Sequence, residues 1–214
     1  MSADNQTDKN NDADSAANAR SKLIETASTI MREGDTIDIS FSELSVRSGL
    51  NSALVKYYFG NKDGLLEAIL ERDMTKIVED VGLLIAKNMP PEDKLRRHIG
   101  AVIDTYHKYP YLHRLTMRLI RDLPPEGARD IAKKYLKPLS EAYSIFVGDG
   151  IKTGVFRDLD SDLFYSAVTG AADRFFTGKL VWKYCYGRDD FDEQMRDSYR
   201  EQTVELIMSG ILAK

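Results

Sequence analysis

Residues 40–66 read SFSELSVRSGLNSALVKYYFGNKDGLL and predict two short helices joined by a turn. The first helix begins at a capping box, because the Ser40 hydroxyl can accept from the backbone N–H of Glu43 while the Glu43 carboxylate reaches back to Ser40. Gly49 suits the left-handed conformation that ends a helix, Leu50 can fill the corner, and Asn51 can cap the next helix. The stretch therefore predicts a helix-turn-helix whose second helix can enter the major groove of DNA.

The second helix has an apolar side and a polar side. Leu54 and Val55, with Phe59 one turn later, can face a core. The other side carries groups that can hydrogen-bond phosphates and base edges, and an alanine that can contact a thymine methyl. The predicted DNA-contacting residues are Ser40, Ser42, Arg47, Asn51, Ser52, Ala53, Lys56, Tyr57, Tyr58 and Lys62.

This segment resembles the DNA-binding unit of the TetR family of transcriptional regulators, with the order and spacing kept without a gap. Leu50 and Asn51 replace the usual Val and Ser, and Lys56 stands where many members carry a Tyr. A second resemblance covers residues 150–164, where a Gly-rich helix exit, an apolar hook and an Asp or Ser N-cap follow one another. The matching residues of the first segment are Ser40, Leu44, Ser45, Ser48, Gly49, Leu50, Asn51, Val55, Tyr58, Phe59, Lys62 and Leu65.

Composition agrees with an all-α chain of one small and one larger helical domain. The chain has 214 residues, of which 43% are hydrophobic, and every periodic segment after Arg20 has a helical period. We expect a disordered tail over 1–19, a helix-turn-helix DNA-binding domain over 20–66, and a ligand-binding and dimerisation domain over 67–214. The net charge of −4 is not evenly spread, since residues 42–62 hold three cations against one carboxylate. DNA affinity depends on where cations face, so the acidic total does not exclude DNA.

The predicted helices after the helix-turn-helix lie near 62–87, 93–108, 110–122, 126–152, 161–185 and 189–212. Pro138 lies inside one of them and predicts a kink. No apolar run reaches about 18 residues and the amino terminus has no signal pattern, so we expect a cytoplasmic protein without membrane contact. Cys185 is the only cysteine, which excludes an internal disulfide and a cysteine-based metal site, and we expect it to be buried packing.

A regulator of this kind responds to an effector. The middle helices have apolar and amphipathic positions that could surround a cavity for a partly apolar small-molecule effector. Each of these residues could equally be core. Polar anchors for a ligand would be Asp104, His107, His113, Arg114, Asp173 and Arg174, and Leu112, Met117 and Phe164 could extend the wall. The predicted ligand-binding residues are Val102, Tyr106, Leu115, Leu119, Tyr135, Leu139, Tyr143, Val168, Ala172, Phe175 and Phe176.

The last two helices carry stripes that could pair with a second copy. One runs through Met195, Tyr199, Thr203, Leu206, Ile207, Gly210 and Ile211, and the other through Ala167, Gly170, Ala171, Arg174 and Gly178. Such faces can form a four-helix interface about a two-fold axis, or they can be intrachain core. The resemblance implies a homodimer that reads a palindromic double-stranded DNA operator and leaves it when a small molecule binds.

Catalysis has little support in the sequence. His107 and His113 are separated by Pro110, no His-x-x-x-His pair occurs, and no Gly-rich phosphate loop follows a strand. The acidic residues at 189–193 could hold a cation, but carboxylates at a helix start have an electrostatic reason of their own. We expect no catalytic residue, no metal and no cofactor. The alternatives to a ligand-responsive repressor are a nucleoid-associated protein that acts through a protein partner and an all-helical enzyme.

Overall fold

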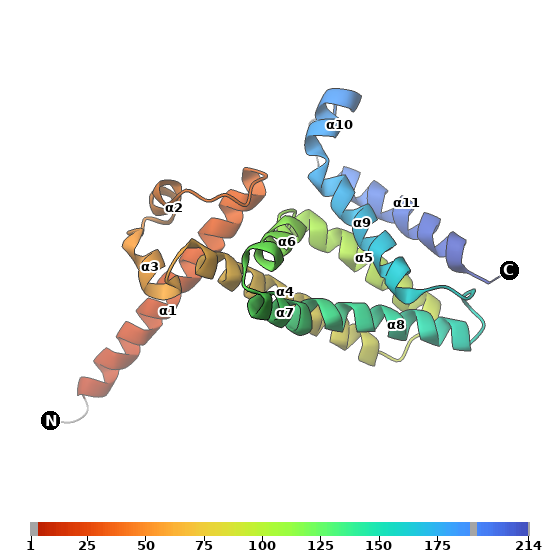
Figure 1. Cartoon of the computed structure of the whole chain (residues 1–214), viewed down its shortest axis with the longest axis horizontal. Helices are drawn as coiled ribbons and strands as arrows, with labels where there is room; N and C mark the ends of the chain where they lie inside the picture. Colours follow the sequence, from red (N-terminus) through yellow and green to blue (C-terminus); the bar gives the residue numbers. More distant parts are fainter. Residues whose placement is uncertain (1–3, 189–191, 214) are drawn as a thin grey trace. The chain divides into compact units, whose positions relative to one another are not determined.

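The computed structural model describes the backbone of residues 4–188 and 192–213 and the side chains from Ala16 onward within those ranges (Figure 1). The described chain is all-α, as predicted, and its only pairing of strand type is an isolated antiparallel bridge between Phe156 and Leu212. None of the helices in these ranges is long and apolar enough to cross a membrane. The elements are α1 (Asp4–Glu33), α2 (Phe41–Ser48), α3 (Ala53–Phe59), α4 (Lys62–Ala86), α5 (Pro91–Lys108), α6 (Leu112–Asp122), α7 (Pro125–Ile131), a π-helical turn η1 (Ala132–Leu136), α8 (Lys137–Lys152), α9 (Ser161–Thr177), α10 (Lys179–Tyr186) and α11 (Glu193–Ile211).

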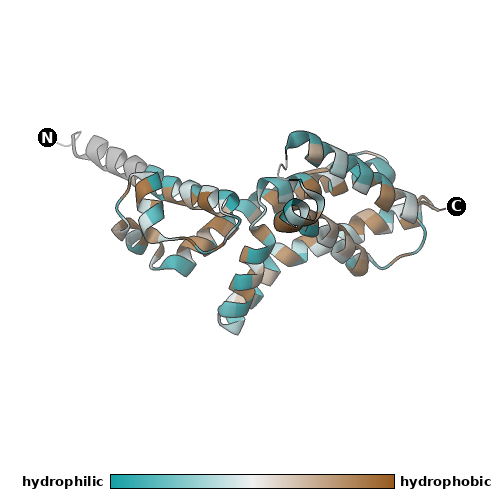
Figure 2. Ribbon diagram, turned by 90° about the horizontal axis from the view of Figure 1, so that it is seen from above, coloured by the Kyte–Doolittle hydropathy of each residue, from teal (hydrophilic) through white to brown (hydrophobic). Residues whose placement is uncertain are grey.

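The chain forms two compact units that meet within α4, between Arg72 and Asp73. The predicted boundary at 66/67 lies a few residues earlier, because the first unit also includes the next turns of α4. Ile69 and Leu70 are buried there, and the Arg72 guanidinium bonds Glu25 of α1 at 2.9 Å and the Ser28 hydroxyl at 2.7 Å. In each unit the apolar residues gather on the inner sides of the helices (Figure 2).

The first unit has a core made by one face of α1 and by single residues of the helix-turn-helix. Leu23, Ala27 and Met31 of α1 are fully buried, as are Val55 of α3 and Leu65 of α4. The apolar spacing along α1 follows the helical period, which is why the predicted stripe supports the two short helices.

Helix α1 begins earlier than the sequence predicts. Its backbone is helical from Asp4, whereas the Asp, Asn and Ser content of residues 1–19 predicts a disordered tail. A polar segment can continue an existing helix because extension costs far less than nucleation, and acidic residues favour a helix amino terminus. Residues 1–3 of that predicted tail lie outside the described backbone.

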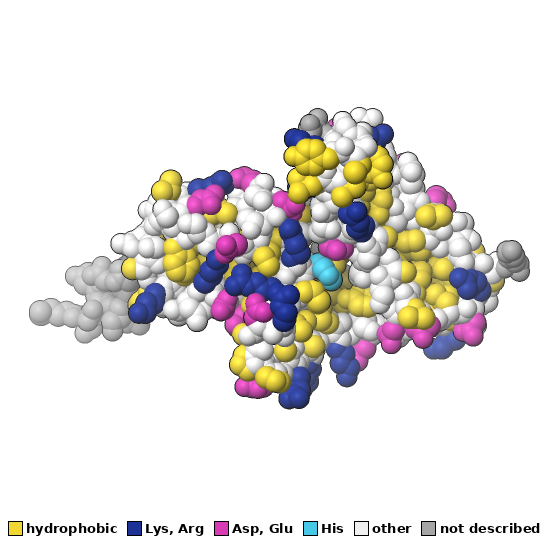
Figure 3. Space-filling model, turned by 45° about the horizontal axis from the view of Figure 1, so that its top comes forward, with side chains coloured by type: hydrophobic (Ala, Val, Ile, Leu, Met, Phe, Trp, Pro, Cys, Tyr) yellow, Lys and Arg dark blue, Asp and Glu magenta, His cyan; other side chains and the backbone are white. Residues whose placement is uncertain are grey.

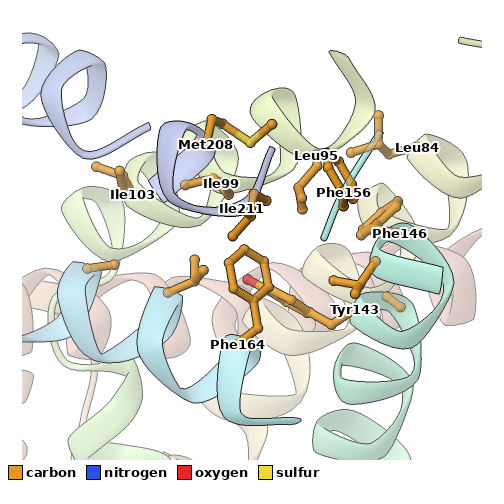
Figure 4. Packing of buried hydrophobic residues seen from close by; sticks show 14 of the residues in the cluster. Leu84, Leu95, Ile99, Ile103, Tyr143, Phe146, Phe156, Phe164, Met208 and Ile211 are labelled. Carbon is orange, nitrogen blue, oxygen red and sulfur yellow. The ribbon is translucent and has the colours of Figure 1, made fainter. Parts of the chain in front are cut away.

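The core of the second unit surrounds α5, which packs against α8, α9 and α11. Figure 4 shows Ile99 and Ile103 of α5 among Phe164, Met208 and Ile211, with Leu84, Leu95, Tyr143, Phe146 and Phe156 beside them. The segment between α8 and α9, residues 153–160, closes this core. Gly150 has no room for a Cβ atom, which would lie 1.9 Å from the Phe156 ring, and Asp160 caps α9 by accepting from the backbone N–H groups of Asp162 and Leu163.

Two predicted helices are interrupted. The helix expected over 126–152 contains the π-helical turn η1 directly before Lys137 and Pro138, because a proline cannot donate to the preceding turn and its ring needs space there. The helix expected over 161–185 breaks at Gly178, where an added Cβ would lie 2.5 Å from an Arg174 guanidinium nitrogen and 2.8 Å from the Arg174 carbonyl oxygen.

Candidate functional site

The turn between α2 and α3 has the geometry that the sequence predicts. Gly49 takes a left-handed conformation with φ of 67°, and its N–H donates to the Ser45 carbonyl at 2.9 Å. The Ser45 hydroxyl donates to the Leu50 carbonyl at 2.5 Å, which fixes the corner. The Asn51 side chain then accepts from the Ala53 N–H at 2.8 Å and starts the second helix. The structure therefore confirms a helix-turn-helix.

The predicted capping box is absent. Ser40 does occupy the N-cap position of α2, but its side chain makes no capping hydrogen bond. The Glu43 carboxylate instead meets the Arg47 guanidinium one turn along α2, with an N–O distance of 3.1 Å. An i,i+4 pair of opposite charges competes with the reciprocal cap for the same carboxylate.

Helix α3 presents a polar and aromatic face to solvent. Lys56 and Tyr57 are exposed, the latter with 77% of its surface accessible, while Ser52 and Tyr58 are half-buried. Val55 on the opposite side is fully buried and holds the helix in place. The exposed set of predicted DNA contacts is Ser40, Ser42, Arg47, Asn51, Ala53, Lys56 and Tyr57.

Two of the predicted cations are held by carboxylates. Arg47 bonds Glu33 at 2.5 Å in addition to Glu43, and Lys62 pairs with Asp38. These exposed ion pairs are weak and salt-sensitive, so a phosphate can compete for either cation. Among the described side chains, Lys56 is the predicted cation without a carboxylate partner. It borders an open hollow lined by Ile39, Phe41, Ser52, Lys56, Gly60, Asn61 and Lys62.

The second unit contains a cavity of about 350 Å³. Four predicted ligand residues line it: Val102, Tyr106, Leu139 and Tyr143. Leu112, Met117 and His113 also lie at its wall, as the sequence suggests. The remaining lining residues are Met74, Ile77, Asp80, Val81, Leu84, His98, Ala101, Thr105, Thr116, Leu136, Tyr165 and Thr169.

The other predicted ligand residues are core. They are buried to 5% exposure or less but do not reach the cavity, and Phe164, which is 8% exposed, does not reach it either. Helical spacing shows which face of a helix is apolar, but it does not distinguish a packed neighbour from a cavity wall. The residues that form core are Leu115, Leu119, Tyr135, Val168, Ala172, Phe175 and Phe176.

The sequence does not predict the contributions of α4 and of the first half of α5 to the cavity. Met74, Ile77, Val81 and Leu84 recur at helical spacing along α4, a pattern that fits core packing as well as a cavity wall. His98 gave no signal, because a lone histidine on an apolar face is usually satisfied core.

Two side chains of the cavity wall carry buried polar atoms without partners. His98 is 3% exposed and Tyr143 is 1% exposed, and among the described residues neither His98 Nε2 nor the Tyr143 hydroxyl has a hydrogen-bond partner. Burial lowers the pKa of His98 to about 4, and burial raises the pKa of Tyr143 well above its ordinary value, so both side chains are neutral at pH 7. Burial also raises the pKa values of Tyr106 and Tyr165 at the same wall.

Of the polar anchors predicted for a ligand, only His113 lines the cavity. Asp104 faces α11, where its carboxylate lies 3.3 Å from Arg200 Nε and 3.9 Å from an Arg196 nitrogen. His107 packs against the ring of Phe176 with centroids 5.5 Å apart. Neither they nor Arg114, Asp173 and Arg174 line the cavity.

The stripes proposed for dimerisation are partly intrachain core. Ile211 and Thr203 are buried, and the Tyr199 ring stacks on Phe175 at 3.7 Å while its hydroxyl donates to the Ala171 carbonyl. Other members of the same stripes stay exposed, namely Ala167, Gly170 and Arg174 of α9 and Leu206 and Gly210 of α11. Leu163 of α9, which the sequence did not single out, is exposed as well.

Helix α10 buries none of its residues. Leu180, Tyr184 and Tyr186 are each more than 60% exposed, and apolar side chains gather on the lobe that α10 forms in Figure 3. Cys185 is exposed as well, so the prediction that it is buried packing is wrong. The sequence shows aromatic neighbours but not that they point into solvent.

Among the described residues no group of three His, Cys, Asp or Glu side chains could hold a metal ion. Asp192 caps α11 by accepting from the Met195 N–H at 2.7 Å, as expected for a carboxylate at a helix start. Residues 189–191 of that acidic run lie outside the described part of the chain.

A helix-turn-helix in one unit and a cavity in the other, within an all-helical chain, are the architecture typical of DNA-binding regulators with a separate ligand-binding domain. A family model described as "Tetracyclin repressor-like, C-terminal domain" matches residues 88–214, which is more than half of the chain. The chain therefore belongs to the TetR family of transcriptional regulators.

Known relatives agree with this assignment. The chain is 28% identical over 85 residues to the HTH-type transcriptional regulator BetI 2 of Chromohalobacter salexigens, and the match spans 40% of each protein. The fold is similar to that of the regulator FadR from Bacillus subtilis in complex with stearoyl-CoA, with a TM-score of 0.64, 20% identity, and 89% and 98% of the two chains covered. A transcriptional regulator from Saccharomonospora viridis in complex with choline gives a TM-score of 0.71 at 16% identity, with 92% and 100% covered.

Proposed function

We propose that this protein is a ligand-responsive transcriptional repressor that binds a palindromic DNA operator as a homodimer and leaves it when a small molecule occupies the cavity. The observation that carries the proposal is α3, a short helix set by the Gly49 turn with Lys56 and Tyr57 exposed on one face. A helix presented in this way fits the major groove, with lysine for phosphates and tyrosine for phosphates or base edges.

Dimerisation supports this function on physical grounds. One helix-turn-helix contacts too few base pairs to be selective, whereas two related by a two-fold axis read both halves of a palindrome. The exposed residues Leu163, Ala167 and Gly170 of α9 and Leu206 of α11 provide apolar and small side chains for close approach of a second copy. A DNA-binding regulator of this kind works in the cytoplasm.

The cavity supports the ligand response. Its volume of about 350 Å³ is at the lower end of the range for small-molecule sites. Helix α4 contributes to its wall and follows α3 directly in the chain. The complexes of two neighbours with stearoyl-CoA and with choline favour a small-molecule effector here, but the two compounds are so different that they do not define its chemistry.

Neither alternative has an observation of its own. A nucleoid-associated protein would need a docking surface for a protein partner, and an enzyme would need a reactive constellation. His107 and Asp173, the acid–base groups that an enzyme of this kind would be expected to use, lie outside the cavity.

The DNA-binding proposal can be tested without knowing the operator in advance. Selection from a random duplex library with purified protein should enrich a palindrome, and fluorescence anisotropy on that sequence should show steep salt dependence. Lys56→Ala should lower the salt slope by about one per bound subunit if Lys56 contacts a phosphate, or cost about 1–3 kcal/mol per half-site if it reads a base.

Lys152→Ala is the matched control, because it removes an exposed lysine at the end of α8 in the second unit. It should leave operator affinity unchanged. Enrichment of no sequence, or equal effects of the two lysine substitutions, would overturn the assignment of α3 as the DNA-reading helix.

A further inference from the structure

The cavity wall is almost entirely uncharged. Among the described residues that line it, none is a lysine or an arginine, His98 is neutral at pH 7, and the acidic and basic side chains that remain are Asp80 and His113, which are both exposed. Asp80 also has a cationic neighbour, Lys76, at 3.4 Å. A charged ligand group deep in this cavity would therefore lose its hydration without gaining a partner of opposite charge.

Two buried polar atoms define what the interior can recognise. The His98 ring packs between the rings of Tyr143 and Phe146, with centroid distances of 4.7 and 4.8 Å, so its position is fixed by α8. His98 and Tyr143 both line the cavity, and each has an unpartnered polar atom that is itself buried, so a ligand group reaches it only when the side chain turns towards the cavity. A buried polar atom without a partner costs free energy that a complementary ligand group can restore.

The Tyr143 hydroxyl determines that the ligand group it binds is a hydrogen-bond acceptor. Because burial keeps the Tyr143 phenol protonated, its O–H can donate to a ligand oxygen. His98 Nε2 in a neutral imidazole either accepts a hydrogen bond or donates one, depending on which ring nitrogen carries the proton. An alcohol suits the first case and a carbonyl group suits the second. Both are uncharged oxygen groups.

We propose that the effector is a small, uncharged, mainly apolar alcohol or carbonyl compound whose oxygen is bound by Tyr143 and His98. Val81, Leu84, Val102 and Leu139 supply the apolar wall for the rest of the molecule. This inference rests on the proposed function for the role of the ligand as an effector, but the binding itself can be measured without DNA.

The test uses simple probes of similar size on the full-length protein: ethylbenzene, benzyl alcohol, acetophenone, phenylacetate and benzyltrimethylammonium. Binding is measured by isothermal titration calorimetry to the wild type and to Tyr143→Phe, which removes only the hydroxyl. Comparing each probe between the two proteins cancels the greater hydrophobicity of the hydrocarbon.

We expect Tyr143→Phe to weaken benzyl alcohol and acetophenone by about three- to tenfold and to leave ethylbenzene unchanged or tighter, since one neutral hydrogen bond is lost. The two charged probes should not bind where the neutral ones do. Tyr135→Phe is the matched control, because Tyr135 is also buried but does not line the cavity, and it should change no affinity. His98→Leu removes Nε2 and should act as Tyr143→Phe does.

Several results would overturn the proposal. Tighter binding of phenylacetate or benzyltrimethylammonium would show that the cavity is built for charge. Equal effects of Tyr143→Phe on the alcohol and on ethylbenzene would show that the hydroxyl recognises no ligand oxygen, and absence of binding by all five probes would count against it as well. Operator binding is measured separately. If the protein binds the probes as expected but binds no DNA, the proposed function as a transcriptional regulator is refuted, whereas the inference about the ligand stands.

Discussion

Buried His98 makes the stability of the protein depend on pH. Its pKa is lowered from 6.5 to about 4 by burial, so the folded state holds the neutral imidazole and the unfolded state takes up a proton more readily. The contribution of neutral His98 to the free energy of unfolding is therefore fully present above the unfolded pKa, and it is lost as the pH drops from about 6.5 towards 4. At about 1.36 kcal/mol per pKa unit, the full loss is roughly 3 kcal/mol, and about 2 kcal/mol of it should appear between pH 7 and pH 5.

Urea unfolding at pH 7 and pH 5 measures this difference in the free energy of unfolding. Other groups titrate over this range too, including His107, whose pKa is also lowered by burial, and Asp173, whose pKa is raised by burial. The wild type is therefore compared with His98→Gln, in which about 2 kcal/mol of the pH dependence should disappear. The readout is the difference between the two pH values and not the absolute stability, since the substitution itself costs packing.

His113→Gln is the matched control, because it removes an exposed imidazole from the rim of the same cavity. It should leave most of the pH dependence in place. If His98→Gln unfolds with the same pH dependence as the wild type, His98 is not buried as a neutral group and the chemistry assigned to the cavity loses its basis.

Two further predictions concern stability and assembly. Tyr111→Phe should lower the free energy of unfolding by about 1.5–3 kcal/mol, because the buried Asp73 carboxylate loses a 2.8 Å hydrogen bond. Tyr143→Phe should be neutral or stabilising, because the Tyr143 hydroxyl has no described partner. Thermal and urea unfolding of the two variants measures this order, and the reverse order would contradict the prediction. Leu206→Asp should weaken the dimer by several kcal/mol, so that monomer appears in sedimentation. Leu83→Asp, an equally drastic change of an exposed leucine on α4, should leave the dimer intact. If both variants sediment as dimers, the interface lies elsewhere.

The helix-turn-helix could be predicted from the sequence because its signals are local. Gly49 and Asn51 act within one turn of the chain, and both behave as expected. The capping box failed for a reason that sequence spacing does not show, since Glu43 had two acceptable partners and Arg47 is the one it meets. Side-chain competition of this kind is decided by a few tenths of a kcal/mol.

The cavity could be predicted only in part. Tyr106 and Leu139 line it, yet Ala172 and Phe176, chosen on the same periodic grounds, are core. Both environments demand apolar side chains, and the difference between them is a volume left unfilled by several helices together. The same limit explains the dimer stripe, because Ile211 and Leu206 lie on one helix but only Leu206 remains exposed.

Helix α4 gives a physical reason to expect coupling between ligand and DNA. Its first turns bury Leu65 and Ile69 in the first unit, and later in the same helix Met74 and Ile77 form part of the cavity wall. A ligand that prefers one arrangement of this wall biases the helix that follows the reading helix in the chain, and only such a preference can shift the equilibrium. A tenfold to hundredfold loss of operator affinity requires about 1.4–2.8 kcal/mol of coupling. Linkage then demands that operator DNA weaken effector binding by the same factor, so an effector that binds free and operator-bound protein equally well would rule out the release mechanism.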